Sequence, residues 1–277
     1  MKYWTQYFGH EKKTKGKRKK YDCNIYTFDI ETTSYLIVDG KQEKATNYLK
    51  LTEKQQKESK KCACMYIWMF GINDDVYYGR TWNELEMFLN NLENVISEQK
   101  FLFIHNQSFE FQFMKSHFHF SEVAARKSHK VMMSIMKDYN ITIKCSYYMS
   151  NCALKYLPDL YNLPVEKQVG DLDYSLIRTP ITKLSDLEMG YCKNDILVLY
   201  YYIKYELETY EDVKHIPNTS TGHVRRELKE KIDKDYKYKR QVRNAINTDP
   251  HIFNLLQQAF MRWLYTFIIC LHRYCFA

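Results

Sequence analysis

Runs of apolar residues along the chain predict several short strands, each bounded by polar or turn-forming residues. The clearest run, Ile25-Tyr-Thr-Phe-Asp-Ile-Glu-Thr-Thr33, is rich in aromatic and β-branched residues and predicts a buried strand. The acidic pair Asp74-Asp75 predicts a hairpin turn between two later strands. Similar runs predict further strands at residues 64–72, 76–78 and 101–104 and within the alternating segment 122–145.

Helical periodicity predicts several helices between these strands. Thr81 and Ser185 each precede such a pattern and are followed three residues later by a glutamate, which is the spacing of a capping box. A proline interrupts a helix, so the pattern that precedes Pro158 should end there. The predicted helices cover residues 82–98, 108–117, 150–157, 184–208 and 221–235.

Strands mixed with covering helices predict an α/β fold in which helices flank a mixed central β-sheet. The 277 residues suffice for one large domain, or for one domain plus part of another. The polar segment 39–61 is interpreted as an inserted loop or a short surface helix. The basic segment 11–20 is either a solvated leader or a contact to a nucleic-acid backbone.

Two carboxylates lie in the first predicted strand. Asp29 and Glu31 are two residues apart, so their side chains should point to the same face of that strand. Adjacent carboxylates on a core strand repel each other and lose hydration, and a hard divalent cation between them would relieve both costs. The alternative is a strand that runs into an exposed acidic turn.

A second acidic position follows the strand predicted over residues 101–104. After that strand, His105 and Asn106 should lie in a loop, and Glu110 should lie near the start of the next helix. A helix N-terminus favours a carboxylate, so capping is an equally good interpretation of Glu110 taken alone. Phe109 could pack in the core or offer a platform on which an unpaired base stacks.

A third acidic position is on the longest predicted helix. Tyr191 and Asp195 are four residues apart and share one helix face. Asp195 could be an ordinary solvated acid, but the apolar run Ile196-Leu-Val-Leu199 follows directly, and a charge on a buried helix needs a partner. Together the four carboxylates could hold two Mg²⁺ or Mn²⁺ ions about 3.5–4 Å apart, an arrangement that hydrolyses phosphodiester bonds. Tyr191 would orient the attacking water.

Composition narrows the function classes. The net charge of +8 favours a polyanionic partner, and the 25 tyrosines offer stacking surfaces for unpaired bases, although most tyrosines serve packing. The eight cysteines contain no matched Cys-x-x-Cys pairs, which argues against a zinc site, and reduced thiols fit a cytoplasm. The chain begins without the apolar core of a secretory signal, and no apolar run reaches the roughly 18 residues of a membrane span.

In their order along the chain, the acidic positions resemble the three exonuclease motifs of family B DNA polymerases. Asp29-Ile-Glu31 is similar to the first motif, residues 106–110 to the second, and Tyr191-x-x-x-Asp195 to the third. The likeness is strongest to the protein-primed branch found in tailed phages and linear plasmids. It covers about residues 24–235 and includes the segments 170–174 and 217–226.

This resemblance implies an RNase H-like (DnaQ-type) proofreading domain that removes nucleotides from the 3′ end of single-stranded DNA with two divalent ions, Mg²⁺ or Mn²⁺. It implies metal binding by the four carboxylates and a catalytic role for Tyr191. A lysine assists catalysis in the family, and Lys167 is its substitute here. The implied contacts to the DNA strand are Thr32, His105, Asn106, Phe109 and Leu154.

The chain departs from the family pattern at some of these positions. Glu110 stands where many members have aspartate, and its extra methylene leaves room for a looser metal site or a lower rate. Ala153-Leu154 matches a family segment that begins with Ser or Thr, so only Leu154 carries over. Asp171 and Asp173 are interpreted as structural turn acids.

The resemblance also divides the chain into segments. The Asp-x-x-Ser-Leu-Tyr-Pro and Tyr-x-Asp-Thr-Asp motifs of the polymerising half do not occur, so this chain should not synthesise DNA alone. After Met261 the expected Gly-Gly-Tyr-Thr is replaced by Arg262-Trp-Leu-Tyr-Thr266, which a single-base frameshift would produce; an authentic apolar C-terminal helix is the alternative. The segments are a basic arm (1–21), an exonuclease domain (22–212), a helical start of the polymerase region (213–261) and an anomalous tail (262–277).

Three functions are compatible with these features. The leading hypothesis is the 3′→5′ exonuclease domain of a truncated protein-primed DNA polymerase. The others are a catalytically weak nucleic-acid-binding remnant and a stand-alone RNA-trimming exonuclease, which would need a contact to the 2′-hydroxyl. The expected partners are a single-stranded DNA 3′ end and a terminal protein or polymerase half, with no membrane. The expected location is the cytoplasm of a phage-infected or prophage-carrying bacterium.

Overall fold

The computed structural model describes residues 1–7, 20–165, 173, 176–234, 237, 240 and 258, without the side chains of residues 46 and 48. The chain divides into two compact units, Met1–His223 and Val224–Ala277, and the first unit holds the described sheet. The predicted basic segment 11–20, Lys167, Asp171 and the tail 262–277 lie outside the described residues.

One mixed nine-stranded sheet organises the described part of the first unit. Its strands are β1 (Lys2–Tyr3), β2 (Tyr26–Val38), β3 (Lys41–Lys44), β4 (Lys60–Ile72), β5 (Asp75–Gly79), β6 (Lys100–Ile104), β7 (Glu122–Ala125), β8 (Val131–Met136) and β9 (Ile141–Cys145). Their spatial order is β1-β5-β4-β2-β6-β9-β8-β7, with β3 beside β2. β2 is central: it runs antiparallel to β4 and parallel to β6, which is itself parallel to β9.

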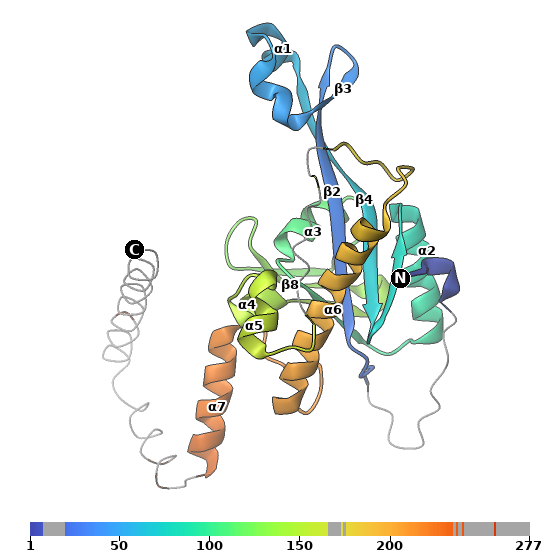
Figure 1. Cartoon of the computed structure of the whole chain (residues 1–277). Helices are drawn as coiled ribbons and strands as arrows, with labels where there is room; N and C mark the ends of the chain where they lie inside the picture. Colours follow the sequence, from blue (N-terminus) through green and yellow to red (C-terminus); the bar gives the residue numbers. More distant parts are fainter. Residues whose placement is uncertain are drawn as a thin grey trace. The chain divides into compact units, whose positions relative to one another are not determined.

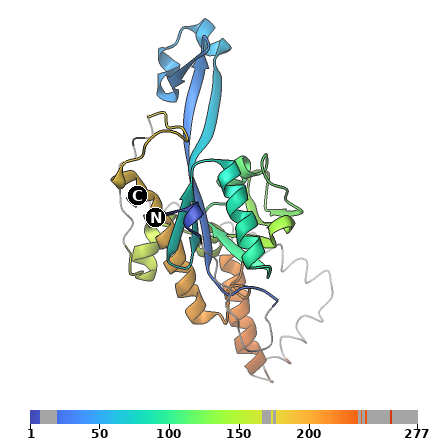
Figure 2. The same ribbon diagram turned by 90° about the vertical axis from the view of Figure 1, so that its right-hand side faces the viewer.

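Helices of the first unit cover both faces of its sheet (Figures 1 and 2). The α-helices are α1 (Glu53–Glu58), α2 (Trp82–Val95), α3 (Ser108–Met114), α4 (Ser146–Ser150), α5 (Leu157–Tyr161), α6 (Asp186–Thr209) and α7 (Ser220–Lys234). Short 3-10 helices are η1 (Trp4–Gln6), η2 (Ala45–Lys50), η3 (Lys137–Tyr139) and η4 (Leu154–Tyr156). None of the helices in the described ranges has the length and apolar character needed to cross a membrane.

Each face of the sheet has its own apolar core. Phe28 and Ile30 of β2 belong to the cluster that contains Phe88 of α2, whose side chain is completely buried. On the other face, Ile67 of β4 packs in a cluster with Ile196 of α6. Complete burial of a side chain of this size contributes about 1.5–3 kcal/mol. The even-numbered residues of β2 therefore face α2, and its odd-numbered residues face α6.

The expected architecture, an α/β fold with a mixed central sheet flanked by helices, is confirmed. Both predicted capping boxes are also confirmed. The Thr81 side chain accepts a hydrogen bond from the Glu84 backbone N–H at the start of α2, and Ser185 and Glu188 make the equivalent contact at α6. These caps satisfy donors that the first turn of a helix leaves without a partner in the helix.

Two local predictions are wrong. Pro158 does not end a helix but lies in the first turn of α5, where the missing N–H of proline costs nothing; the preceding helix, α4, ends at Asn151 in the left-handed conformation. The hairpin turn is Asn73-Asp74 rather than Asp74-Asp75, because Asp75 already belongs to β5. Asn73 has a φ of 55°, which a tight hairpin turn requires and asparagine tolerates.

The segment 39–61 contains more regular structure than the predicted loop or short helix. β2 and β4 are 13 residues long each and continue past the main sheet, where β3 pairs with the end of β2 (Figure 1). η2 and α1 follow β3, and Thr52 and Gln55 form a complete capping box at α1. The segment is therefore a three-stranded extension of the sheet with a helical cap.

Candidate metal centre

Asp29 and Glu31 of β2 and Asp195 of α6 form a compact acidic cluster. Each offers one carboxylate oxygen, and these oxygens all lie within 4.8 Å of one another. Asp29 and Glu31 pair in register with Met69 and Ile67 of β4, which belong to the core cluster under α6. Strand alternation therefore directs both acids toward α6, and the structure brings together three of the four predicted carboxylates.

Close packing of α6 on β4 places Asp195 at this cluster. A Cβ atom added to Gly71 would lie 2.8 Å from Cγ2 of Ile196, a separation that real Cβ atoms essentially never show. Glycine at position 71 therefore lets the helix approach the sheet, and Ile196 brings its neighbour Asp195 with it. Tyr191 lies one turn earlier on the same helix, and its side chain is half-buried.

Glu110 approaches the cluster from α3, which follows β6. Its side chain is 3% exposed, and its Oε2 atom is buried without a hydrogen-bond donor among the described residues. Burial is the main cause that raises the pKa of Glu110 to about 8, and the charge of Glu31 acts in the same direction, whereas a hydrogen bond with the Asp29 side chain opposes the shift. Glu110 thus stands beside the other acids as a fourth carboxylate.

The four acids destabilise one another's ionised forms. Burial raises the pKa of Asp29 well above its ordinary range, and the charges of Glu110, Glu31 and Asp195 raise it further. A divalent cation would remove both the repulsion and the desolvation cost. Carboxylate oxygens are the ligands that Mg²⁺ and Mn²⁺ prefer, and the buried Oε2 of Glu110 has no hydrogen-bond partner within the described part of the chain. The residues present therefore fit a divalent-metal site.

The cluster is accessible from the side of Asp29. Glu31 and Asp195 are 8% and 6% exposed, whereas the Asp29 side chain has intermediate exposure. A ligand of the acids would therefore approach along Asp29.

The loop after β6 and the first turn of α3 carry three residues that were predicted to contact single-stranded DNA. Asn106 is exposed and has a φ of 60°, a left-handed conformation in which asparagine is enriched. Nδ1 of His105 lies 2.9 Å from Oγ of Ser146, which orients the ring. Phe109 is 42% exposed, and its ring centroid lies 5.2 Å from that of Phe113. Phe109 is therefore available for stacking one residue before Glu110.

Thr32 and Leu154, also predicted as DNA contacts, have other surroundings. Thr32 follows Glu31 in β2, so its side chain points to the opposite face of the strand, and it pairs in register with Met65. Leu154 lies in η4 and packs against the apolar cluster that contains Leu157. DNA contacts of these two residues stay predictions, as does the catalytic role of Lys167, which lies outside the described residues.

A buried ion pair that the sequence did not suggest fixes the segment before α6. Arg178 is 5% exposed, and its Nη2 lies 2.6 Å from Oε1 of Glu188. The backbone N–H of Arg178 donates to Oγ1 of Thr33, and that hydroxyl donates to the backbone oxygen of Leu176. The ion pair therefore holds residues 176–178 across β2, two residues past Glu31. In the sequence Glu188 was recognised only as a capping residue, and no signal indicated Arg178.

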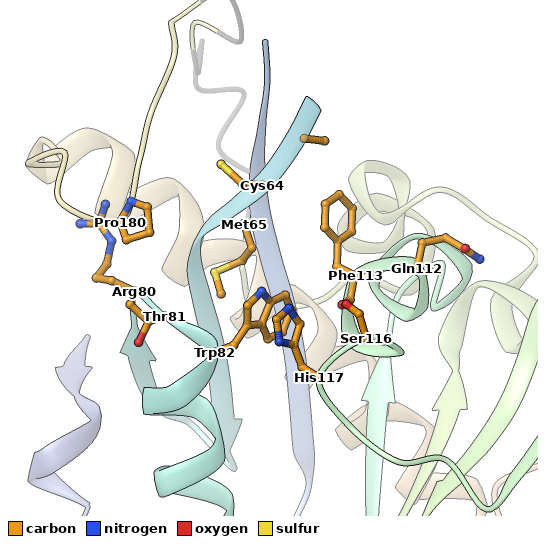
Figure 3. A pocket seen from close by; sticks show the side chains of 11 residues that line it. Cys64, Met65, Arg80, Thr81, Trp82, Gln112, Phe113, Ser116, His117 and Pro180 are labelled. Atoms are coloured by element: carbon orange, nitrogen blue, oxygen red, sulfur yellow. The ribbon is translucent and has the colours of Figure 1, made fainter. Parts of the chain in front are cut away.

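A cavity of about 540 Å³ lies between the start of α2 and the end of α3 (Figure 3). Arg80 and Pro180 line one side and Phe113 the other, and Trp82 stacks on His117 with ring centroids 4.8 Å apart. None of the four carboxylates lines this cavity. The candidate metal centre is therefore defined by the geometry of the acids and not by this cavity.

No protein-family model and no curated protein sequence matches the chain. Among solved structures, phi29 DNA polymerase complexed with single-stranded DNA is similar, with a TM-score of 0.54 and 16% identity over 76% of this chain. The same polymerase complexed with primer-template DNA gives a TM-score of 0.53, also at 16% identity over 76% of this chain. The chain covers 35% of the length of each. This likeness confirms the expected fold, mixed α/β of the RNase H-like type.

Proposed function

We propose that this chain is a metal-dependent 3′→5′ exonuclease for single-stranded DNA, distantly related to the exonuclease domains of protein-primed family B DNA polymerases. The observation that carries the proposal is the convergence of Asp29, Glu31 and Asp195, with Glu110 beside them, at one buried place. The order of the sequence motifs and the fold shared with part of phi29 DNA polymerase support it.

In this proposal the four carboxylates hold two divalent ions, Mg²⁺ or Mn²⁺. When bound, the ions lower the pKa of an attacking water and stabilise the charge on the leaving 3′ oxygen. Tyr191, one turn from Asp195, orients the water through its hydroxyl. Hydrolysis breaks the bond between the last phosphorus and the 3′ oxygen of the preceding nucleotide, and releases a nucleoside 5′-monophosphate.

The DNA strand would enter along Asp29, the more accessible acid. Phe109 would stack on one of the last bases, since an exposed aromatic ring binds unpaired bases without sequence preference. His105 and Asn106 lie in the loop between β6 and α3, just before Phe109, and would contact the strand beside it. The net charge of +8 favours binding of a polyanion of this kind.

A 5′-labelled single-stranded DNA oligonucleotide tests the proposal. With Mg²⁺ or Mn²⁺, the full chain should produce a ladder that shortens from the 3′ end, and EDTA should stop the reaction. Asp29→Asn and Asp195→Asn should abolish cutting while leaving salt-sensitive binding. Asp186→Asn is the matched control, because Asp186 is an exposed acid of the same helix, about 13 Å from Asp195 along its axis.

Three other outcomes would overturn the proposal. Full activity of Asp29→Asn or Asp195→Asn would exclude the metal assignment. Binding of DNA by the wild-type chain without any cutting would indicate a nucleic-acid-binding remnant of a polymerase. Faster cutting of RNA than of DNA would indicate an RNA-trimming enzyme.

A further inference from the structure

The sheet extension carries a two-sided ribbon of three short strands. We call it the lysine ribbon; it comprises residues 34–38 of β2, the strand β3, and residues 60–62 of β4. In its register Tyr35 lies between Lys44 and Cys62, and Ile37 lies between Gln42 and Lys60. Side chains paired in this way point to the same face, so these six form one surface of two adjacent rows.

The two faces of the ribbon differ in burial. Leu36 and Val38 on one face are only 2% and 7% exposed, and β2 and β3 both contact η2. On the other face, Tyr35 and Ile37 have intermediate exposure. Lys44 and Lys60, which flank them, are exposed. One face of the ribbon is therefore covered by its own helical cap, and the other is open.

The open face continues the side of β2 that carries the metal-site acids. The side chains of Asp29, Glu31, Tyr35 and Ile37 all occupy odd-numbered positions of β2. The register between β2 and β4 shifts after Glu31, and the extra residue of this bulge, Tyr66, belongs to β4. Alternation along β2 is therefore unbroken. At ~3.3 Å per residue, Tyr35 lies ~13 Å beyond Glu31 along the strand. Residues 176–178 lie over Thr33 between the acids and the ribbon, so a strand that leaves the acidic cluster reaches the ribbon by passing over this segment.

The charge of the ribbon and its cap suits a polyanion. Residues 34–62 contain seven lysines and four acidic residues. Neither Lys44 nor Lys60 forms an ion pair with an acid in the described ranges, and the Tyr35 hydroxyl makes no hydrogen bond there. Unpaired lysines on either side of a half-exposed aromatic ring are the combination that binds single-stranded nucleic acid, through phosphates and through stacking on a base.

We propose that the open face of the lysine ribbon binds the single-stranded DNA several nucleotides upstream of the 3′ end that is cut. This inference rests on the proposed function and extends it, because it assigns a second contact site for the same substrate. Lys44 and Lys60 neutralise phosphates on opposite edges of the face, and the Tyr35 ring stacks on a base between them. A short oligonucleotide reaches the acids and not the ribbon; a longer one reaches both.

The test measures binding of 5′-labelled oligonucleotides of 4 and 16 nucleotides in EDTA by fluorescence anisotropy, as a function of salt. The variants are Lys44→Ala/Lys60→Ala and Tyr35→Ala. The matched control is Lys41→Ala/Lys61→Ala, which removes two exposed lysines of the same two strands on the opposite face. Thermal unfolding of each variant confirms that it is folded.

For the longer oligonucleotide, the Lys44/Lys60 variant should reduce the slope of log affinity against log salt by about 1.4, since each phosphate contact contributes about 0.7 for single strands. Tyr35→Ala should weaken its binding by at least about fivefold. Binding of the 4-mer, and its cleavage rate with Mn²⁺, should be unchanged in both variants. The Lys41/Lys61 control should resemble the wild type.

Equal loss in the control, or no loss in the ribbon variants, would overturn the inference. Tighter binding of a blunt duplex than of single strands at this face would overturn it as well. The two failures give different results. If the proposed function is wrong, the wild-type chain does not cut the 4-mer, but the binding assay still measures whether the ribbon variants weaken binding of the longer oligonucleotide.

Discussion

Ile196 of α6 packs so closely on Gly71 of β4 that a Cβ at position 71 would lie 2.8 Å from its Cγ2 atom. The same added Cβ would also collide with the Thr27 side chain. Because Asp195 is the neighbour of Ile196, the absence of a side chain at position 71 determines where this acid lies relative to Asp29.

Gly71→Ala should therefore destabilise the fold and the metal centre together. We expect a loss of ~1–3 kcal/mol in the free energy of unfolding, measured with urea, because the overpacked side chain forces α6 or Thr27 to move. Thr27→Ala removes one of the two collisions. The stability loss of the double variant Thr27→Ala/Gly71→Ala should therefore be smaller than the sum of the losses of the two single variants. Additive losses would show that the close contact does not control packing here.

The pH dependence of stability offers a test of the buried carboxylates. The folded-state pKa of Glu110 is about 8, above its ordinary value of 4.5, so the folded chain binds more protons than the unfolded chain between these values. In the metal-free protein, the contribution of Glu110 to the free energy of unfolding should therefore be greatest below about pH 4.5. This contribution should be lost as the pH rises through about 8. Glu110→Gln should flatten this fall in thermal melts, and an unchanged fall would contradict the assignment.

Divalent ions should reverse this trend. A cation binds the ionised carboxylates, so its affinity should rise with pH and its stabilisation should be largest where the metal-free protein is weakest. At an ion concentration a hundredfold above Kd, each bound ion should add ~2.7 kcal/mol to the free energy of unfolding. Melting curves with and without Mn²⁺ at pH 6 and pH 8 measure the effect. A gain that is larger at pH 6 would argue against carboxylate ligands.

The buried pair Arg178–Glu188 should anchor the segment that crosses β2. Arg178→Met removes the cation from the Glu188 carboxylate, which keeps its hydrogen bonds from Ser185. Loss of one member of a buried pair costs ~3–5 kcal/mol, and the capping contacts and partial exposure of Glu188 reduce the expected loss. Arg178→Met/Glu188→Gln should recover part of the stability, and chemical denaturation measures both. If the single variant is as stable as the wild type, the pair does not hold this segment.

Phe109 should contribute to DNA binding and little to folding. Its side chain is 42% exposed, so Phe109→Ala should leave the melting temperature nearly unchanged. Loss of one stacked base should weaken single-strand binding by ~1–3 kcal/mol, whereas Phe109→Tyr should retain it. Anisotropy titrations with a labelled oligonucleotide distinguish the three proteins, and equal affinities would exclude Phe109 from the binding surface.

Local patterns in the sequence predicted the elements that create the metal centre. The spacing of Asp29 and Glu31 on an apolar strand, and of Tyr191 and Asp195 on an apolar helix, was sufficient because strand and helix periods fix which side chains share a face. The glutamate at position 110 was ambiguous, since a helix N-terminus accepts a carboxylate for other reasons. Its burial beside Asp29 depends on how α3 leaves β6, which no local pattern specifies.

Features that depend on contacts distant in sequence were not predictable. The close approach of Gly71 and Ile196 joins residues 125 positions apart in the numbering, and neither residue type is unusual in its local context. Lys144 is buried because three backbone oxygens of residues 213–216 accept its hydrogen bonds, a set of partners that only the folded chain supplies. The sequence pattern did not predict that β2 and β4 extend into the lysine ribbon, because many residues there are polar and an exposed ribbon tolerates polar residues.

Direct measurement of Mn²⁺ binding tests the central claim, that acids of a strand and two helices share divalent ions. Electron paramagnetic resonance of the free ion, titrated with the full chain at pH 8, gives the number of ions bound. We expect two ions for the wild type and for Asp186→Asn, and a loss of binding for Asp29→Asn and Asp195→Asn. No binding by the wild type in the millimolar range, or equal binding by Asp29→Asn, would contradict the account.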